Sequence, residues 1–197
     1  ELPAAAIASE IDELETDLGE ETVTTRSPGY LLHRDRWEAL LSERVREQGG
    51  EFLLDARITG VEGTRLVLAR NGTCEHIFGE VLIGADGVSS LVRASLGEPR
   101  PRCLVTLQRT YPLPESERRT RKVRVFFRDY LPGGYGWYFP KEDTVHVGLG
   151  VEREFCPHLV PALEKLEAEL REKGWLGTAA SITRTGGFLP AGTVAKT

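Results

Sequence analysis

Three segments of the chain carry hydrophobic residues at helical spacing. The strongest is 35–48, whose apolar positions fall on one face and which ends at the pair Gly49-Gly50. Residues 158–173 repeat this pattern with four leucines on one side, and residues 2–17 show a weaker version of it. The spacing therefore predicts two amphipathic helices and a short helix at the start of the chain.

Runs of β-branched and aromatic residues predict strands in the first half of the chain. Segments 57–61, 65–70 and 73–78 are separated by short turns, and Asn71-Gly72 is a strong hairpin signal. We therefore expect a three-stranded antiparallel β-meander in this region.

Three other segments are expected to be extended. The apolar runs 52–54 and 81–83 are typical of buried strands in a parallel sheet. Residues 20–33 are predicted to be extended, with a turn at Ser27-Pro28-Gly29.

The second half of the chain has a different character, because longer strands rich in aromatic residues follow residue 102. A strand-like tail begins at Ser181. The expected strands are 103–111, 121–128, 135–139 and 144–151. The predicted fold class is α/β, with an α/β lobe first and a mostly antiparallel sheet with one helix second, divided near residue 100.

Composition and charge exclude several classes of function. Apolar residues make up 40% of the 197 residues, charged residues make up 28%, and the net charge is −5. No basic stripe is present, so we expect no nucleic acid partner. The three cysteines and four histidines lack metal-ligand spacing, so we expect reduced cysteines, surface or loop histidines and no metal. No apolar run reaches the ~20 residues that span a bilayer.

A strand-to-turn segment at residues 82–93 is the first candidate site. An apolar strand ends in Gly84-Ala85-Asp86-Gly87 and leads into a short helix. Glycine lets the backbone approach a ligand closely, and an acid at a strand end can accept hydrogen bonds from ribose hydroxyls or loop amides. A tight turn with a capping acid explains the same residues without any ligand.

An alternating aromatic strand is the second candidate site. Tyr135, Trp137 and Phe139 fall on one face of the strand that precedes Pro140. Gly148 and Gly150 alternate in the same way on the next strand and leave space on one face. A wide apolar wall beside a gap suits a long apolar ligand, although an aromatic sheet core with glycines for packing has the same pattern.

The first motif resembles the Asp-Gly motif of FAD-dependent aromatic-ring hydroxylases. The resemblance implies that Asp86 and Gly87 lie by the FAD pyrophosphate. Arg34, which opens the helix Arg34-Asp35-Arg36-Trp37-Glu38, occupies the position of an arginine that reaches the cofactor in that family. The backbone near Ile58 is a further candidate for contact with adenine.

The second motif resembles the Tyr-x-Trp-x-Phe-Pro signature of the geranylgeranyl reductase family, which continues into Gly-x-Gly. The resemblance covers roughly residues 26–192 and implies that the substrate cavity for the isoprenoid chain is lined by Tyr135, Trp137, Phe139, Pro140, Gly148 and Gly150. It further implies a Rossmann-like, three-layer FAD-binding lobe at about 1–100 and 181–197, with a substrate-binding sheet at 101–180.

The family's activity implies an FAD-dependent oxidoreductase that reduces carbon–carbon double bonds of a geranylgeranyl chain. The substrate would be an archaeal-type lipid precursor or a chlorophyll-type molecule, and the electron donor would be NAD(P)H or ferredoxin. Because flavin supplies the chemistry, no catalytic side chain is assigned. We expect a cytoplasmic protein that meets its lipid substrate at the inner face of the membrane.

Two alternatives remain open. The Asp-Gly motif fits an aromatic hydroxylase or monooxygenase equally well. The glycine motif GxGxxG that grips the ADP half of FAD is absent, and the chain has no methionine, so we expect a section of a longer protein. A non-catalytic domain that binds a lipid or a partner is therefore the second alternative.

Overall fold

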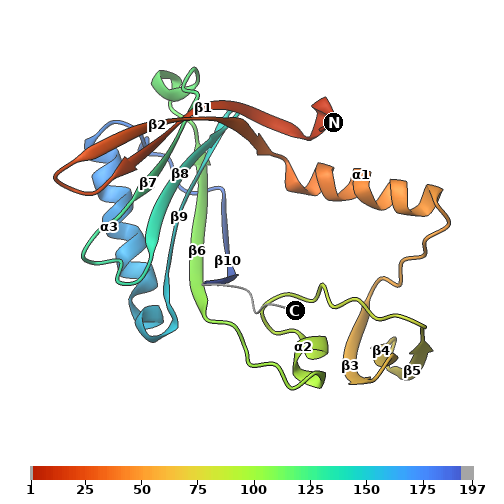
Figure 1. Ribbon diagram of the computed structural model, residues 1–197. Coiled ribbons are helices and arrows are strands. Elements are labelled where there is room, and N and C mark those ends of the chain that lie inside the picture. The colour runs from red at the N-terminus through yellow and green to blue at the C-terminus, as the bar shows by residue number, and fades with distance from the viewer. Residues whose placement is uncertain (1, 192–197) are drawn as a thin grey trace. The chain divides into compact units, whose positions relative to one another are not determined.

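The computed structural model describes residues 2–191, which form two compact units (Figure 1). Unit 1 contains the residues up to 43 together with 104–189. Unit 2 contains residues 44–103 and 190–191. The helix α1 (Arg34–Glu47), predicted at 35–48, is confirmed and crosses the sequence boundary between the units.

Unit 1 is built on a seven-stranded mixed sheet in the order β10-β6-β9-β8-β7-β1-β2. β1 runs parallel to β7, whereas the pairs β1–β2, β7–β8, β8–β9 and β6–β9 are antiparallel. The strands are β1 (Ile7–Asp17), β2 (Thr22–Leu32), β6 (Cys103–Pro112), β7 (Lys122–Phe126), β8 (Tyr135–Lys141), β9 (Thr144–Glu152) and β10 (Thr183–Pro190). The strands expected in the second half of the chain are thus confirmed.

One face of this sheet is covered by the helix α3 (Leu159–Glu172) (Figure 1). Leu163, Leu166 and Leu170 are fully buried against Val147 and Leu149 of β9. Burying a side chain of this size contributes roughly 1.5–3 kcal/mol, so the apolar stripe seen in the sequence fixes α3 to the sheet. Three short 3₁₀ turns complete the unit: η1 (Ala4–Ala6), η2 (Glu115–Glu117) and η3 (Arg153–His158).

Unit 2 contains the predicted β-meander. Its three strands are antiparallel in the order β3 (Ala56–Glu62), β4 (Arg65–Arg70), β5 (Thr73–Phe78). Asn71 has a positive φ of 49° and Gly72 one of 78°, as a tight hairpin turn requires. The short helix α2 (Leu91–Ser95) follows the Asp-Gly turn, so both predictions are confirmed.

The helix predicted at 2–17 is wrong, because most of this segment forms β1. Strand neighbours on both sides supply its backbone hydrogen bonds. Its acidic side chains also meet basic partners across the parallel pair: Glu13 with Lys122 at 2.8 Å and Glu15 with Arg124 at 3.3 Å. Tertiary pairing therefore outweighs a weak helical pattern.

The turn predicted at Ser27-Pro28-Gly29 lies inside β2. The register passes from the pair Ile11–Gly29 to the pair Glu13–Arg26, so two residues of β2 oppose one residue of β1. Pro28 has no amide hydrogen to donate, and a bulge is a position in a strand where proline is tolerated.

The strands predicted at 52–54 and 81–83 are also wrong. Val81 is 77% exposed and Ile83 is 83% exposed, and neither segment has a strand partner among residues 2–191. A strand needs a hydrogen-bonding neighbour, so these apolar runs remain irregular. Unit 2 as described is consequently a three-stranded antiparallel sheet rather than a three-layer parallel one.

The units also differ from the predicted division near residue 100. Residues 7–32 supply two strands of the large sheet, because β1 is paired to β7 along five residues. The functional assignment of residues 1–100, 101–180 and 181–197 stays a prediction.

Candidate functional site

Four aromatic side chains form a ladder on the face of the sheet opposite α3. Tyr138 of β8 belongs to the core under α3, so its neighbours Tyr135, Trp137 and Phe139 point to the other face. The ring centroid of Trp137 lies 6.0 Å from that of Tyr135 and 6.2 Å from that of Phe139. The ring centroid of Phe127 lies 6.0 Å from that of Tyr135. We call these four residues the aromatic ladder. Phe127 follows β7 directly and was missed by the sequence analysis.

The indole of Trp137 occupies the space that Gly148 leaves on the neighbouring strand. The two residues are paired in register, and a Cβ built on Gly148 would lie 2.5 Å from Trp137 Cζ2. Gly150 is also buried, and a Cβ there would lie 3.1 Å from the Thr106 methyl group. The Trp137 indole therefore fills the gap that the sequence predicted beside Gly148. The absence of a side chain at Gly148 lets the indole approach the backbone of the sheet closely.

Polar side chains from two neighbouring strands hold the indole in place. Trp137 Nε1 donates a hydrogen bond to Gln108 Oε1 at 3.0 Å. The Gln108 amide nitrogen lies 3.3 Å from Nδ1 of His146. A neutral imidazole can accept at Nδ1, so the arrangement assigns the ring proton of His146 to Nε2. The three side chains form a continuous chain of neutral groups.

His146 is a half-buried residue of β9, which corrects the expectation of a surface or loop histidine. Burial lowers its pKa to about 4, with smaller contributions from the positive charge of Lys141 and from His33. The ring is therefore neutral near pH 7. The alternation of side chains along β9 could have predicted this position, because His146 lies two residues before Gly148 and therefore on the same face of the strand as Gly148 and Gly150.

Pro140 does not share the face of the ladder. It is buried, and alternation along β8 places it with Tyr138 on the side of α3. The structure thus brings Tyr135, Trp137 and Phe139 together and leaves Pro140 apart from them.

The Asp-Gly turn of unit 2 is organised by its own hydrogen bonds. The Asp86 carboxylate accepts the backbone N–H of Leu91 at 2.7 Å and of Val92 at 3.4 Å, and Ser90 Oγ accepts that of Arg93 at 2.9 Å. The interaction with Ser90 and these amides holds the pKa of Asp86 below its usual range. Asp86 is therefore an anionic cap of α2, and Ser90 is the N-cap residue of this helix.

The backbone of this turn is unobstructed at Gly87. Its φ of 78° lies in the left-handed region, and no heavy atom outside its chain neighbours comes within 4 Å of an added Cβ. The backbone at Asp86-Gly87 is exposed and unobstructed, and its predicted contact with a cofactor stays a prediction.

The other two predicted cofactor residues have simple surroundings. Arg34 is 79% exposed and forms an ion pair with Glu38 one turn later in α1. Ile58 is half-buried in β3, where it pairs with Leu68 of β4. Their predicted contacts with a cofactor stay predictions.

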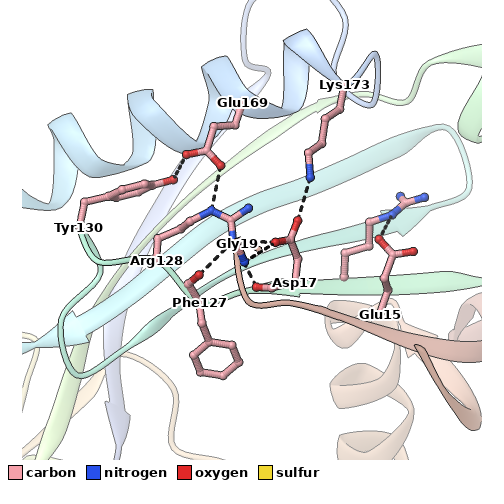
Figure 2. Close-up of polar contacts among 9 residues, drawn as sticks. Glu15, Asp17, Gly19, Phe127, Arg128, Tyr130, Glu169 and Lys173 are labelled. Atoms are coloured by element: carbon pink, nitrogen blue, oxygen red, sulfur yellow. Dashed lines mark hydrogen bonds and ion pairs between the residues drawn. The ribbon is translucent and has the colours of Figure 1, made fainter. Parts of the chain in front are cut away.

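An ion-pair network ties the β1–β2 hairpin to the segment after β7 and to α3 (Figure 2). The Asp17 carboxylate, 3% exposed, accepts a hydrogen bond from Arg128 Nη1 at 2.8 Å and lies 2.8 Å from Lys173 Nζ. Arg128 Nε also donates to Glu169 at 3.0 Å. Burial opposes ionisation of Asp17, but the bonds from Arg128 and Lys173 outweigh it and hold its pKa well below the usual range. The network fixes the segment that begins with Phe127.

Two other kinds of feature, a metal site and a membrane-spanning helix, are absent from residues 2–191. No group of three or more histidine, cysteine or acidic side chains is placed to hold a metal ion. None of the helices described is both long and apolar enough to cross a membrane.

Solved structures identify the class of fold. A geranylgeranyl bacteriochlorophyll reductase-like protein from Thermoplasma acidophilum matches 96% of this chain and 52% of its own, with a TM-score of 0.81 and 19% identity. A flavin-dependent brominase matches 94% of this chain and 53% of its own, with a TM-score of 0.66 and 14% identity. The chain therefore has the fold of about half of a flavin-dependent oxidoreductase.

Sequence relatives define the family more narrowly. The digeranylgeranylglycerophospholipid reductase of Methanococcus aeolicus is 28% identical over 183 residues, which are 87% of this chain and 46% of the relative. The corresponding reductase of Methanocaldococcus jannaschii is 27% identical over 186 residues, which are 89% of this chain and 47% of the relative. No family model matches the sequence. The chain is a distant homologue of these reductases and spans about half of their length.

Proposed function

We propose that this chain is part of an FAD-dependent oxidoreductase that reduces carbon–carbon double bonds in a geranylgeranyl chain carried by a lipid or a chlorophyll-type molecule. The observation that carries the proposal is the aromatic ladder on the sheet face opposite α3. Four rings in contact provide an elongated apolar wall, which suits a long isoprenoid chain.

The ladder would bind and orient the substrate chain. Tyr135, Trp137 and Phe139 would line one side of it, and Gly148 and Gly150 would let the wall lie close to the sheet. The hydrogen bond from Trp137 to Gln108 fixes the largest ring, so the wall is organised before the substrate arrives. Apolar side chains of this kind also exclude water from the bound chain.

The residues of unit 2 would hold part of the cofactor. Asp86 and Gly87 would lie by the pyrophosphate of FAD, and Ile58 would lie by the adenine. Reduced FAD would supply the hydride for one carbon of a double bond, and a proton from water would go to the other carbon. The open backbone at Gly87 and the fixed carboxylate of Asp86 support this assignment.

The exposed apolar segments of unit 2 support a larger FAD-binding domain. Val81 is 77% exposed and Ile83 is 83% exposed, and further parts of such a domain would cover these apolar side chains. In this proposal residues 1–100 and 181–197 belong to the FAD-binding domain, and 101–180 form the substrate-binding sheet. The substrate would bring the protein to the inner face of the membrane, and NAD(P)H or ferredoxin would reduce the flavin.

Flavin reoxidation in the natural protein that contains this chain would test the proposal. The protein is loaded with FAD, reduced without oxygen and mixed with a geranylgeranyl lipid. We expect the flavin absorbance to return and the lipid to gain two mass units for each bond reduced. Trp137→Leu should slow this reoxidation at least tenfold while leaving the flavin spectrum unchanged. Tyr30→Leu, an exposed aromatic residue outside the ladder, should have no effect.

Other outcomes would favour the alternatives. A flavin that the lipid does not reoxidise, but that consumes oxygen in the presence of an aromatic substrate, would identify a hydroxylase. A protein that takes up no FAD and binds prenyl lipids equally well after Asp86→Ala would be a non-catalytic binding module.

A further inference from the structure

Unit 1 contains an apolar pocket on the side of the sheet that faces α3. Its volume is about 340 Å³, at the lower end of the range for small-molecule sites. It is lined by Asp129, Tyr130, Pro132, Val151, Phe155, His158, Pro161, Ala162 and Lys165. Val151 belongs to the core under α3, so the pocket and the aromatic ladder lie on opposite faces of the sheet.

The aromatic wall of this pocket is fixed by the ion-pair network. The Tyr130 hydroxyl donates to Glu169 Oε1 at 2.6 Å, while the second oxygen of Glu169 accepts from Arg128 (Figure 2). Arg128 is held in turn by the buried Asp17. Burial and Glu169 raise the pKa of Tyr130, so its hydroxyl stays a donor near pH 7. The ring is thus positioned before any ligand binds.

The mouth of the pocket carries an available positive charge. Lys165 Nζ lies 4.3 Å from the centroid of the Tyr130 ring. In the described part of the chain no carboxylate lies within ion-pair distance of Lys165, and Glu169, one turn further along α3, is occupied by Tyr130 and Arg128. Asp129, whose carboxylate also has no ion-pair partner within residues 2–191, lines the same pocket and is exposed.

We infer that this pocket binds a small amphipathic anion, with an apolar chain against Tyr130, Phe155 and Ala162 and a carboxylate or phosphate head beside Lys165. Apolar walls with one unpaired cation select this chemistry, because the chain is desolvated while the head replaces water around the ammonium group. The site is separate from the proposed substrate wall and needs no flavin.

Calorimetric titration of the 197-residue chain with decanoate, decanol and decylammonium, each as monomers, would test this inference. The three probes share a chain and differ in the charge of the head. We expect decanoate to bind roughly two- to fivefold more tightly than decanol, the range for one exposed charge contact. Decylammonium should bind most weakly. Equal affinities, or a preference for decylammonium through Asp129, would overturn the inference.

Variants locate the binding. Lys165→Gln should abolish the preference for decanoate, and Lys165→Glu should transfer it to decylammonium. Arg119→Gln makes the same charge change at an exposed arginine outside the pocket and should alter nothing. Tyr130→Phe keeps the ring but loses the bond to Glu169, so it should weaken all three probes alike. A preference for decanoate that survives Lys165→Gln would show that the head lies elsewhere. Because FAD is not added, a failure here leaves the proposed reductase activity untouched.

Discussion

The Trp137 indole lies over the backbone of Gly148, so closely that a Cβ at position 148 would sit 2.5 Å from Cζ2 and 2.8 Å from the carbonyl oxygen of Leu107. The glycine is therefore a steric requirement of the aromatic ladder. Neither the indole nor the neighbouring strand can move away without loss of packing or of the hydrogen bond to Gln108.

Gly148→Ala is accordingly expected to destabilise the protein by about 1–3 kcal/mol, the usual cost of overpacking. It should also displace the indole, which urea unfolding and the indole N–H resonance in nuclear magnetic resonance spectra would report. Gly29→Ala is the matched control, because nothing lies within 4 Å of its added Cβ in the same sheet. A Gly148→Ala variant with native stability and an unshifted indole signal would contradict this account.

Loss of the buried carboxylate of Asp17 should be costly. Asp17→Asn removes the buried anion shared by Arg128, whose side chain is 13% exposed, and Lys173, and leaves Arg128 with Glu169 alone. Removing one member of a buried pair costs roughly 3–5 kcal/mol, which urea unfolding would measure. Asp12→Asn breaks an exposed pair with Arg121 and should cost less than ~1 kcal/mol. Equal costs for the two variants would mean that burial is not what makes the network important.

The neutral state of His146 predicts a pH dependence of stability. An unfolded histidine has a pKa of about 6.5, and burial first, then Lys141 and His33, lowers that of His146 to about 4. Between these values the unfolded chain binds a proton that the folded chain does not. Stability is therefore complete above the unfolded pKa and falls as the pH decreases toward the folded one.

His146→Gln should flatten this dependence in urea unfolding between about pH 6.5 and 4.5. Asp17 contributes little change in this window, because its stabilising contribution is lost mainly as the pH falls below its ordinary pKa of 3.8 toward the lowered folded one. If wild type and variant lose stability in parallel, His146 is not the group that titrates.

Two variants would separate the structural role of Asp86 in the Asp-Gly turn from its proposed role in binding FAD. Asp86→Ala and Ser90→Ala each remove a cap of α2, worth about 1 kcal/mol, and should speed amide exchange at Leu91 and Arg93. In the natural protein that contains this chain, the proposed cofactor role predicts that only Asp86→Ala also weakens FAD binding, by more than tenfold. Equal FAD affinity of the two variants would make Asp86 a structural cap alone.

Short-range patterns in the sequence determined the amphipathic helices, the β-meander and the alternating faces of β8 and β9. Each depends on neighbours a few residues apart. The spacing of leucines fixes α3, the Asn71-Gly72 turn fixes the hairpin, and the alternation of Tyr135, Trp137 and Phe139 fixes one face of the sheet. Sequence resemblance also led to the reductase family, of which the chain is a distant homologue.

Only the tertiary structure decided where strands found partners and which polar groups met. Residues 7–17 form a strand because β2 and β7 lie beside them and pair with them. Residues 81–83 form no strand, because within residues 2–191 no strand lies beside them to supply hydrogen bonds. Gln108 joins Trp137 from 29 positions away, and Arg128 joins Asp17 from 111. Such contacts arise from the folding of distant segments onto one another. The pKa of His146 and the buried charge of Asp17 depend on that folding, because burial and the approach of distant charges set them both.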